Sequence, residues 1–468
     1  MRSARRHSSV RSSLNDRLSW LVLFVLFVSP LLFGSNRPVF WAAWGVILSL
    51  TGIWWFWRMS GTSERLRVAV RHERFLSLCF LTMGAYMVLQ ALPLGLASAP
   101  VSTPTSPDLQ LSMPSISLTP GDTLLSLVRW VSYGLLFFFT LQLAANRSRA
   151  FRFIRAVYWI IVIQAVIALA FRFQFGDTIL GIAKTSYLGS ITGGFVNRNS
   201  FATYLAFGVV LGLALVLERT LFPAKSRDPK APRLDAYTGK GGVVQLLVGW
   251  LIILATLFGT NSRMGTASAL IAVFVMACLA TAKLPRGAIG KPGWLIAGGM
   301  LVVLVALFLL HGQTLFERLG TAGRDQDVRL DIYRQVISMI KVRPLLGFGG
   351  NSFEFVYPLY HDFPVSIEAI FDKTHNTYLS NWVEYGLVFG SIPLLICGFL
   401  LLKLVRAYLD SAVPDMIIMA GLGTVIVAAV HSLTDFSLEI EGVTFLFTAL
   451  VAAAYSRSVM RTNSESDD

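Results

Sequence analysis

Long apolar runs, repeated along the whole chain, are the feature that most constrains its fold. Hydrophobic residues make up 54% of the 468 residues and charged residues only 14%. A helix that crosses a membrane needs roughly 20 mostly apolar residues, and about twelve such runs occur. They lie near residues 18–34, 39–57, 76–95, 122–144, 153–172, 199–217, 242–259, 264–281, 292–310, 386–403, 413–432 and 440–456.

Each run is expected to be a helix, because backbone polar groups in lipid must be satisfied within the segment that crosses it. The alternating ten-residue strands of a transmembrane barrel are absent from the sequence. The first run follows a basic segment but is followed by no small-residue cleavage site, so we expect it to remain as an anchor. The sequence therefore predicts an all-α, polytopic integral membrane protein with about twelve transmembrane helices.

The distribution of positive charge predicts the orientation. The net charge is +14, which we attribute to topology rather than to nucleic-acid binding, because Lys and Arg collect in cytoplasmic loops. With the N-terminus inside, most Lys and Arg fall on the cytoplasmic side, with clusters at 65–74, 147–152 and 225–233, whereas the loop 96–121 carries none. We expect both termini to be cytoplasmic and the Pro-rich loop 96–121 to be extended on the outside.

One long polar segment, 311–378, divides the chain into three predicted parts. Residues 1–310 would form an N-terminal bundle of about nine spans, and residues 379–468 about three further spans and a cytoplasmic tail. Within the polar segment, 328–342 has apolar residues at helical spacing, and Pro344 ends that helix. A second helix is expected to start near His375 or Asn376 and to run into the span at 386–403. Cys79, Cys278 and Cys397 each fall within a span and are predicted to be apolar packing residues.

Four arginines lie on the predicted outer side, where the charge distribution predicts few. Three of them are in loops or at the start of the amphipathic helix, and one is near the outer end of the span 122–144: Arg198, Arg263, Arg329 and Arg129. An arginine near lipid normally has an anionic partner. A structural salt bridge to Asp122, Asp331 or Asp435 is one alternative. For Arg198 and Arg263 we favour ligand binding, because the planar guanidinium matches phosphate oxygens.

Other polar residues on that side could move protons. His375 could accept a proton from a hydroxyl near neutral pH, or could make a hydrogen bond at a helix start. Glu384 could orient His375 or an arginine, or pair with one. His431 and Asp435 are one helical turn apart and could form a carboxylate–imidazole pair, for which we favour a structural role. No third ligand would complete a metal site with them.

Taken together, these residues resemble the O-antigen ligase and O-antigen polymerase superfamily of bacterial inner-membrane glycosyltransferases. The matching segments occur in order over roughly residues 190–400. They are Phe195–Asn199, Ser262–Arg263, Arg329–Tyr333, Pro344–Gly349, His375–Leu379 and Glu384–Gly386. Where the family commonly has Ser-Arg-Gly, this chain has Met264 between Arg263 and Gly265.

The resemblance implies a multi-pass protein of the bacterial inner membrane with its active site facing the periplasm. The implied donor is a glycan on undecaprenyl pyrophosphate, and the acceptor is lipid A core or another lipid-linked glycan. Arg198, Arg263, Arg329 and Arg129 would bind the pyrophosphate, and His375 would act as base, with Glu384 and Asp435 as further catalytic candidates. Fixed cations lower the barrier where negative charge develops. Since no carboxylate cluster in the outer loops is typical of a metal site, we expect no metal or other cofactor.

Two alternatives stay open at this stage. A polysaccharide flippase or other transporter would explain the spans, but it would need ionisable residues along a path through the bilayer centre. Here the charges gather near one face. A protein O-oligosaccharyltransferase would use the same donor site, but the outer loop is short for a protein-acceptor domain. We therefore favour a polysaccharide polymerase or ligase.

Overall fold

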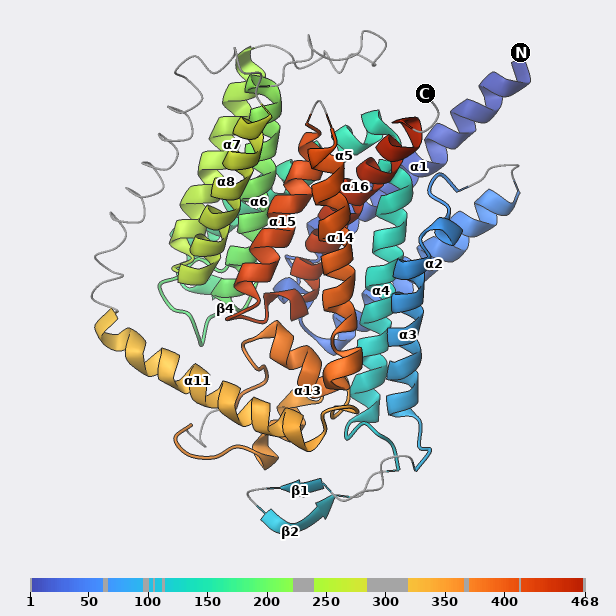
Figure 1. Ribbon diagram of the computed structural model, residues 1–468. Coiled ribbons are helices and arrows are strands. Elements are labelled where there is room, and N and C mark those ends of the chain that lie inside the picture. Colours follow the sequence, from blue (N-terminus) through green and yellow to red (C-terminus); the bar gives the residue numbers. More distant parts are fainter. Residues whose placement is uncertain are drawn as a thin grey trace.

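Helices account for nearly all of the regular structure in the computed structural model (Figure 1). It describes residues 2–61, 66–95, 101–103, 106–111, 114–221, 240–283, 319–365, 370–411 and 414–465. The long helices are α1 (Arg2–Val28), α2 (Pro38–Ser60), α3 (Arg74–Ala91), α4 (Pro120–Ala144), α5 (Arg147–Phe175), α6 (Arg198–Thr220), α7 (Lys240–Gly259), α8 (Arg263–Ala282), α11 (Leu319–Val342), α13 (Thr377–Phe389), α14 (Ile392–Leu409), α15 (Met416–His431) and α16 (Glu441–Glu465).

The remaining elements are short. They are the helix α12 (Phe353–Val356), the 3-10 helices η1 (Phe33–Ser35), η2 (Val70–His72), η5 (Tyr357–Leu359) and η6 (Ser437–Glu439), and the strands β1 (Val101–Thr103), β2 (Ser106–Leu111), β3 (Thr178–Ile179) and β4 (Ile182–Ala183). The Pro-rich loop 96–121 is therefore not simply extended, since β1 and β2 pair antiparallel within it, with Val101 opposite Leu111. No turn signal in this loop is strong enough to predict that hairpin.

The all-α prediction is confirmed. Among the described residues, nine helices are long and apolar enough to cross a membrane: α2 to α8, α14 and α16. α15 is apolar but shorter, with 16 residues. The predicted span 292–310 lies outside the described residues, as do 311–318 and most of the connector at 218–241. The count of about twelve spans remains a prediction.

The centre of the bundle is α6, which packs against α5, α7, α8 and α15. In its most apolar stretch 94% of the residues are buried, compared with 22% for α3 and for α14. Small residues on α6 allow the close approach, as is common between membrane helices. A Cβ atom added at Gly208 would lie 2.6 Å from a methyl carbon of Ile161, and one at Gly212 would lie 2.6 Å from the Trp250 ring.

The helix that follows the polar segment does not continue into the next span, so that prediction was wrong. α13 ends at Phe389 and α14 begins at Ile392. The break begins at Gly386, whose φ of +73° is outside the helical region and suits only glycine there. A Cβ atom on Gly386 would lie 2.2 Å from the carbonyl oxygen of Leu345.

The break lets two glycine-containing segments pair through their backbones. The amide of Phe348 donates to the Val383 carbonyl at 3.0 Å, and the amide of Gly349 donates to the Glu384 carbonyl at 2.9 Å. The amide of Leu387 donates to the Pro344 carbonyl at 2.7 Å. Residues 344–349 are therefore held against the C-terminal part of α13.

The two chain ends lie at one end of the bundle, and α11 and α13 lie at the other (Figure 1). Near the chain ends, a buried ion pair joins α15 to α16. Asp415 caps α15 by accepting from the amide of Ile417 at 3.0 Å, and its other oxygen accepts from Arg457 Nη2 at 3.1 Å. Their side chains are only 7% and 11% exposed.

Removing one partner of this pair should destabilise the fold more than replacing both. Arg457→Met leaves a buried carboxylate unpaired and should cost about 3–5 kcal/mol. The double variant Asp415→Ser/Arg457→Met keeps a helix cap and should recover most of that loss. Thermal unfolding of the detergent-purified variants measures both effects. A double variant no more stable than Arg457→Met would contradict the role given to the pair.

Candidate active site

The predicted site residues lie at the end of the bundle opposite the chain termini. α6 and α8 begin there, α15 ends there, and α11 and α13 cover it (Figure 1). Helix starts leave backbone N–H groups unpaired and favour negative charge. Arg198 opens α6 and Arg263 opens α8, each following a capping side chain, Asn197 and Ser262. The sequence thus places an arginine on two helix starts at the same end of the molecule.

Ser190 links these two helix starts. Its hydroxyl oxygen accepts hydrogen bonds from Arg198 Nη1 at 3.3 Å and from Asn261 Nδ2 at 3.4 Å. The guanidinium carbon of Arg198 lies 5.4 Å from the ring centre of Tyr187. Arg263, two residues after Asn261, has an exposed side chain. The loops before α6 and α8 therefore meet at Ser190, which contacts Arg198 directly and contacts Asn261, two residues before Arg263.

The turn between α15 and α16 supplies the next contacts. Arg329, on α11, donates through Nη1 to the Thr434 carbonyl at 3.0 Å. Asp435 is 1% exposed. Its Oδ1 accepts from Asn199 Nδ2 at 3.1 Å, and its Oδ2 accepts from the Ser437 hydroxyl. Asp435 thereby connects this turn to the first turn of α6.

His375 lies directly before the capping residue of α13, with a φ of +56°. Such a conformation is uncommon for a residue other than glycine and needs support from its surroundings. Its carbonyl accepts from the Tyr333 hydroxyl at 2.8 Å, and its ring meets the Phe436 ring edge-on with centroids 5.0 Å apart. Among the described residues, its buried Nδ1 has no hydrogen-bond partner.

Burial lowers the pKa of His375 below its ordinary value. The Asp435 carboxylate raises this pKa in part, and the Arg329 guanidinium lowers it. The imidazole is therefore neutral at neutral pH and able to accept a proton.

Tyr187 lies close to charged side chains from several of the segments that form the site. Burial raises its pKa, and Asp435 raises it further, while Arg198 and Arg329 lower it. Since such charge effects act over short distances, Tyr187 lies near side chains from three separate parts of the chain. Sequence reasoning missed Tyr187, because a single tyrosine in a polar loop has no distinguishing spacing.

His431 and Asp435 do not hydrogen-bond as a pair. His431 Nδ1 shares a hydrogen bond with the Thr203 hydroxyl, whereas Asp435 bonds to Asn199. Asn199 and Thr203 are one turn apart on α6, which matches the spacing of their two partners. These contacts hold α15 against α6 and support the structural role favoured for the pair.

Arg129 lies in a neighbouring cluster inside the bundle. It donates through Nη2 to the Glu439 carbonyl and through Nε to the Tyr133 hydroxyl at 3.2 Å. Its guanidinium carbon lies 4.6 Å from the ring centre of Trp41. The carboxyl oxygens of Glu441, which is 0% exposed, have no hydrogen-bond partner among the described residues. The acidic groups closest to Arg129 thus come from the start of α16 and the turn before it.

Glu384 belongs to the same neighbouring cluster. Burial and the Glu439 carboxylate raise its pKa to about 7, although Lys373 lowers it. Lys373 Nζ lies 3.4 Å from Glu439 Oε2 and donates to Asn351 Oδ1 at 3.2 Å. A carboxyl group with this pKa can exchange a proton near neutral pH.

The structure therefore brings Arg198, Arg329, His375 and Asp435 into one neighbourhood and places Arg263 beside it. Arg129 and Glu384 lie in the second cluster, which joins the first through Lys373 and Glu439. Both joining residues were missed by sequence reasoning, although each lies within four residues of a predicted one. Within the described part of the chain, no group of three or more His, Cys, Asp or Glu side chains could hold a metal ion.

Part of the chain is similar to a known protein family. Residues 248–392 match the family model described as O-antigen ligase. The matched segment includes Arg263, Arg329, His375 and Glu384, and it ends before Asp435. No curated protein matches the chain. The family match confirms the resemblance of this helical chain to the O-antigen ligase and O-antigen polymerase superfamily over the matched residues.

Proposed function

We propose that the protein transfers a glycan from undecaprenyl pyrophosphate to a sugar acceptor at the periplasmic face of the bacterial inner membrane. The acceptor is another lipid-linked glycan in a polymerase or lipid A core in a ligase. The observation that carries the proposal is the convergence of Arg198, Arg329 and His375, from three separate segments, at the end opposite the chain termini. The positive charge of the remaining loops supports cytoplasmic termini and hence a periplasmic site.

The arginines in this proposal stabilise the leaving group. Transfer breaks the bond between the anomeric carbon and a diphosphate oxygen, and negative charge develops on the diphosphate. Arg198, Arg263 and Arg329 hold fixed positive charge and several N–H donors where that charge appears. Arg129 acts from the neighbouring cluster, where it sets the position of the α15–α16 turn through Glu439. The reaction in this scheme uses no metal ion.

His375 acts as the base. It accepts the proton of the acceptor hydroxyl as that oxygen attacks the anomeric carbon. Asp435, close enough to influence the pKa of His375, stabilises the imidazolium that forms. Glu384 is the alternative proton acceptor, because its pKa lies near neutrality. Attack from the face opposite the leaving group would invert the anomeric centre, which a comparison of the donor and product configurations decides.

Loss of a single site arginine should impair transfer without unfolding the protein. We expect Arg198→Ala and Arg263→Ala to reduce the transfer rate about 10²–10³-fold, as removal of a preorganised donor does in other enzymes. Arg198→Lys should also be impaired, because lysine lacks the planar fork. The assay is transfer from a lipid-linked donor by protein reconstituted in liposomes.

The matched control is on α11. Arg329→Ala should behave like the other two alanine variants, whereas Arg334→Ala should not, since Arg334 has a 77% exposed side chain paired with Asp331. Normal transfer by Arg198→Ala and Arg263→Ala, with both proteins monodisperse, would exclude the proposed leaving-group role.

The pH dependence should follow His375. The base must be neutral, so the rate is lost as the pH falls through the pKa of His375, which lies below the ordinary value of about 6.5. Asp435 and Asp372 raise that pKa and Arg329 lowers it. Asp435→Asn should therefore move the acidic limb of the rate profile to lower pH, and Arg329→Gln should move it to higher pH.

His375→Ala should bind the donor but not turn it over. Full activity in this variant, or an acidic limb that neither charge substitution moves, would assign the base to another group, with Glu384→Gln as the next variant to test.

Deletion of the gene in its host tests the proposed pathway step. Lipid A core bearing a single repeat unit would indicate a polymerase, and bare core with accumulated lipid-linked chains would indicate a ligase. Chemical analysis of the surface glycan distinguishes the two. A surface glycan of normal length and amount after deletion would contradict both.

A further inference from the structure

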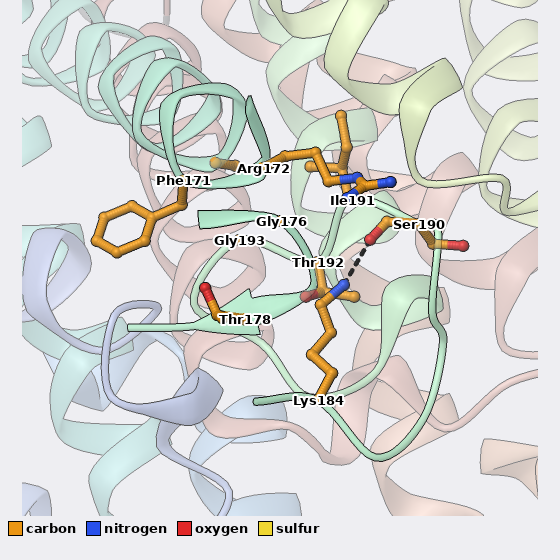
Figure 2. A pocket seen from close by; sticks show the side chains of 10 residues that line it. Phe171, Arg172, Gly176, Thr178, Lys184, Ser190, Ile191, Thr192 and Gly193 are labelled. Carbon is orange, nitrogen blue, oxygen red and sulfur yellow. Dashed lines mark hydrogen bonds between the residues drawn. The ribbon is translucent and has the colours of Figure 1, made fainter. Parts of the chain in front are cut away.

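A small pocket lies beside the candidate active site, between the end of α5 and the loop that leads to α6. Figure 2 shows Arg172, Lys184 and Ser190 around it, with Thr178 and Thr192 on its walls. It has about 200 Å³ of empty space measured to its open mouth. Its inner part has room for about one water-sized group, so a ligand would enter with a terminal atom rather than as a whole.

Two hydroxyl groups of this pocket lack hydrogen bonds. The Oγ1 atoms of Thr178 and Thr192 are buried and have no partner among the described residues. Thr192 as a whole is 2% exposed. A buried hydroxyl without a partner costs free energy, because its hydrogen bonds to water are lost and not replaced. The two threonines therefore offer donors to a group that enters from the mouth.

The pocket also holds more positive than negative charge. Asp177 is shared between Lys184, with Nζ 3.4 Å from Oδ1, and Arg172, with Nη1 3.7 Å from the same oxygen. The Lys184 side chain is 3% exposed and donates to the Ser190 carbonyl at 2.6 Å. Burial lowers the pKa of Lys184, and the Asp177 carboxylate offsets this only in part. An additional anion would compensate for the burial of this ammonium group.

We propose that this pocket binds a phosphate group carried by a lipid, with Lys184 and Arg172 facing its charge and Thr178 and Thr192 donating to the terminal oxygen that enters. Phosphate oxygens accept hydrogen bonds from each of these groups. Three observations in one place support the proposal. The two threonine hydroxyls have no hydrogen-bond partner among the described residues, the cationic side chains outnumber the acidic one, and the pocket is open to the surface.

The surroundings favour a lipid rather than a soluble anion. Apolar side chains near the pocket in sequence are strongly exposed, with Phe173 at 84%, Phe175 at 57%, Ile182 at 61% and Leu188 at 64%. Exposed apolar side chains beside a charged pocket are typical of a contact with lipid. Ser190 joins the pocket to the candidate active site, because its carbonyl contacts Lys184 and its hydroxyl contacts Arg198.

Two lipids carry the required group. One is the polyprenyl diphosphate of the donor, and this source rests on the proposed function. The other is an anionic phospholipid of the surrounding bilayer, and this source does not. If the ligand is the donor diphosphate, the pocket would bind the phosphate that Arg198 does not reach. If the ligand is an anionic phospholipid, its binding would anchor the loop that contains Tyr187.

The test is lipid binding by the full-length protein, measured by native mass spectrometry. The protein is placed in nanodiscs of phosphatidylcholine and titrated either with phosphatidylglycerol or with undecaprenyl pyrophosphate. Lys184→Gln and Thr192→Val are compared with wild type and with Lys341→Gln, which removes an exposed lysine on α11. We expect Lys184→Gln to weaken binding of one of the two lipids about tenfold or more, and Thr192→Val to weaken binding of the same lipid by less.

The lipid whose binding is weakened identifies the source of the phosphate group. Lys341→Gln should bind both lipids as wild type does. If Lys184→Gln does not fold, the nearly isosteric Thr192→Val decides alone. Unchanged binding of both lipids in the folded variants would overturn the proposal. Transfer activity measured on the same samples is a separate readout, so an inactive wild-type protein would reject the proposed function without affecting the binding result.

Discussion

The turn from Thr434 to Glu441, between α15 and α16, is the constraint on which the candidate site depends. Its carbonyl and carboxylate oxygens receive hydrogen bonds from α11, α6, the start of α13 and α4, and an ion pair from the segment before α13. The donors are Arg329, Asn199, Thr377, Lys373 and Arg129. Five parts of the chain thus acquire their relative positions from one short segment. A displacement of this turn would separate the two clusters and move His375 away from Arg329.

Charge is distributed in a way that suits a reaction on a large anion. Asp435 bonds to two uncharged groups, Asn199 and Ser437, so it does not neutralise a site arginine through a direct hydrogen bond in these contacts. In the second cluster the acids Glu384 and Glu439 lie beside Lys373 and Arg129, and burial raises the pKa of both acids. The first cluster is therefore the more positive of the two. A diphosphate is drawn to positive charge. The same charge and burial keep the His375 imidazole neutral by lowering its pKa, and the Asp435 carboxylate restores part of its basicity.

Much of the architecture could be predicted from the sequence, because lipid imposes helices and a minimum length on every span. The starts of α4, α6 and α8 follow from Pro120, Asn197 and Ser262. The end of α11 follows from Pro344. The break at Gly386 could not be predicted, since it depends on a backbone contact with Leu345, about forty residues earlier. A local periodicity carries no information about such a contact.

The site was predictable to a similar degree. Arg198, Arg329, His375 and Asp435 could be identified because each is a polar residue in an unusual position along an apolar chain. Their partners could not, because the pairing of His431 with Thr203 and of Arg129 with Glu439 joins residues more than two hundred positions apart. Tyr187, Lys184 and Thr192 have ordinary sequence surroundings, and their interest comes only from burial and from the groups that they face.

The most direct measurement is a structure of the protein with undecaprenyl pyrophosphate bound, determined by electron cryo-microscopy in nanodiscs. We expect the diphosphate to lie within hydrogen-bonding distance of Arg198 and Arg329, with Arg263 closing on it and the His375 ring facing the side where the acceptor hydroxyl would arrive. Diphosphate density at the opposite end of the bundle, or at this end but out of reach of all three arginines, would contradict it.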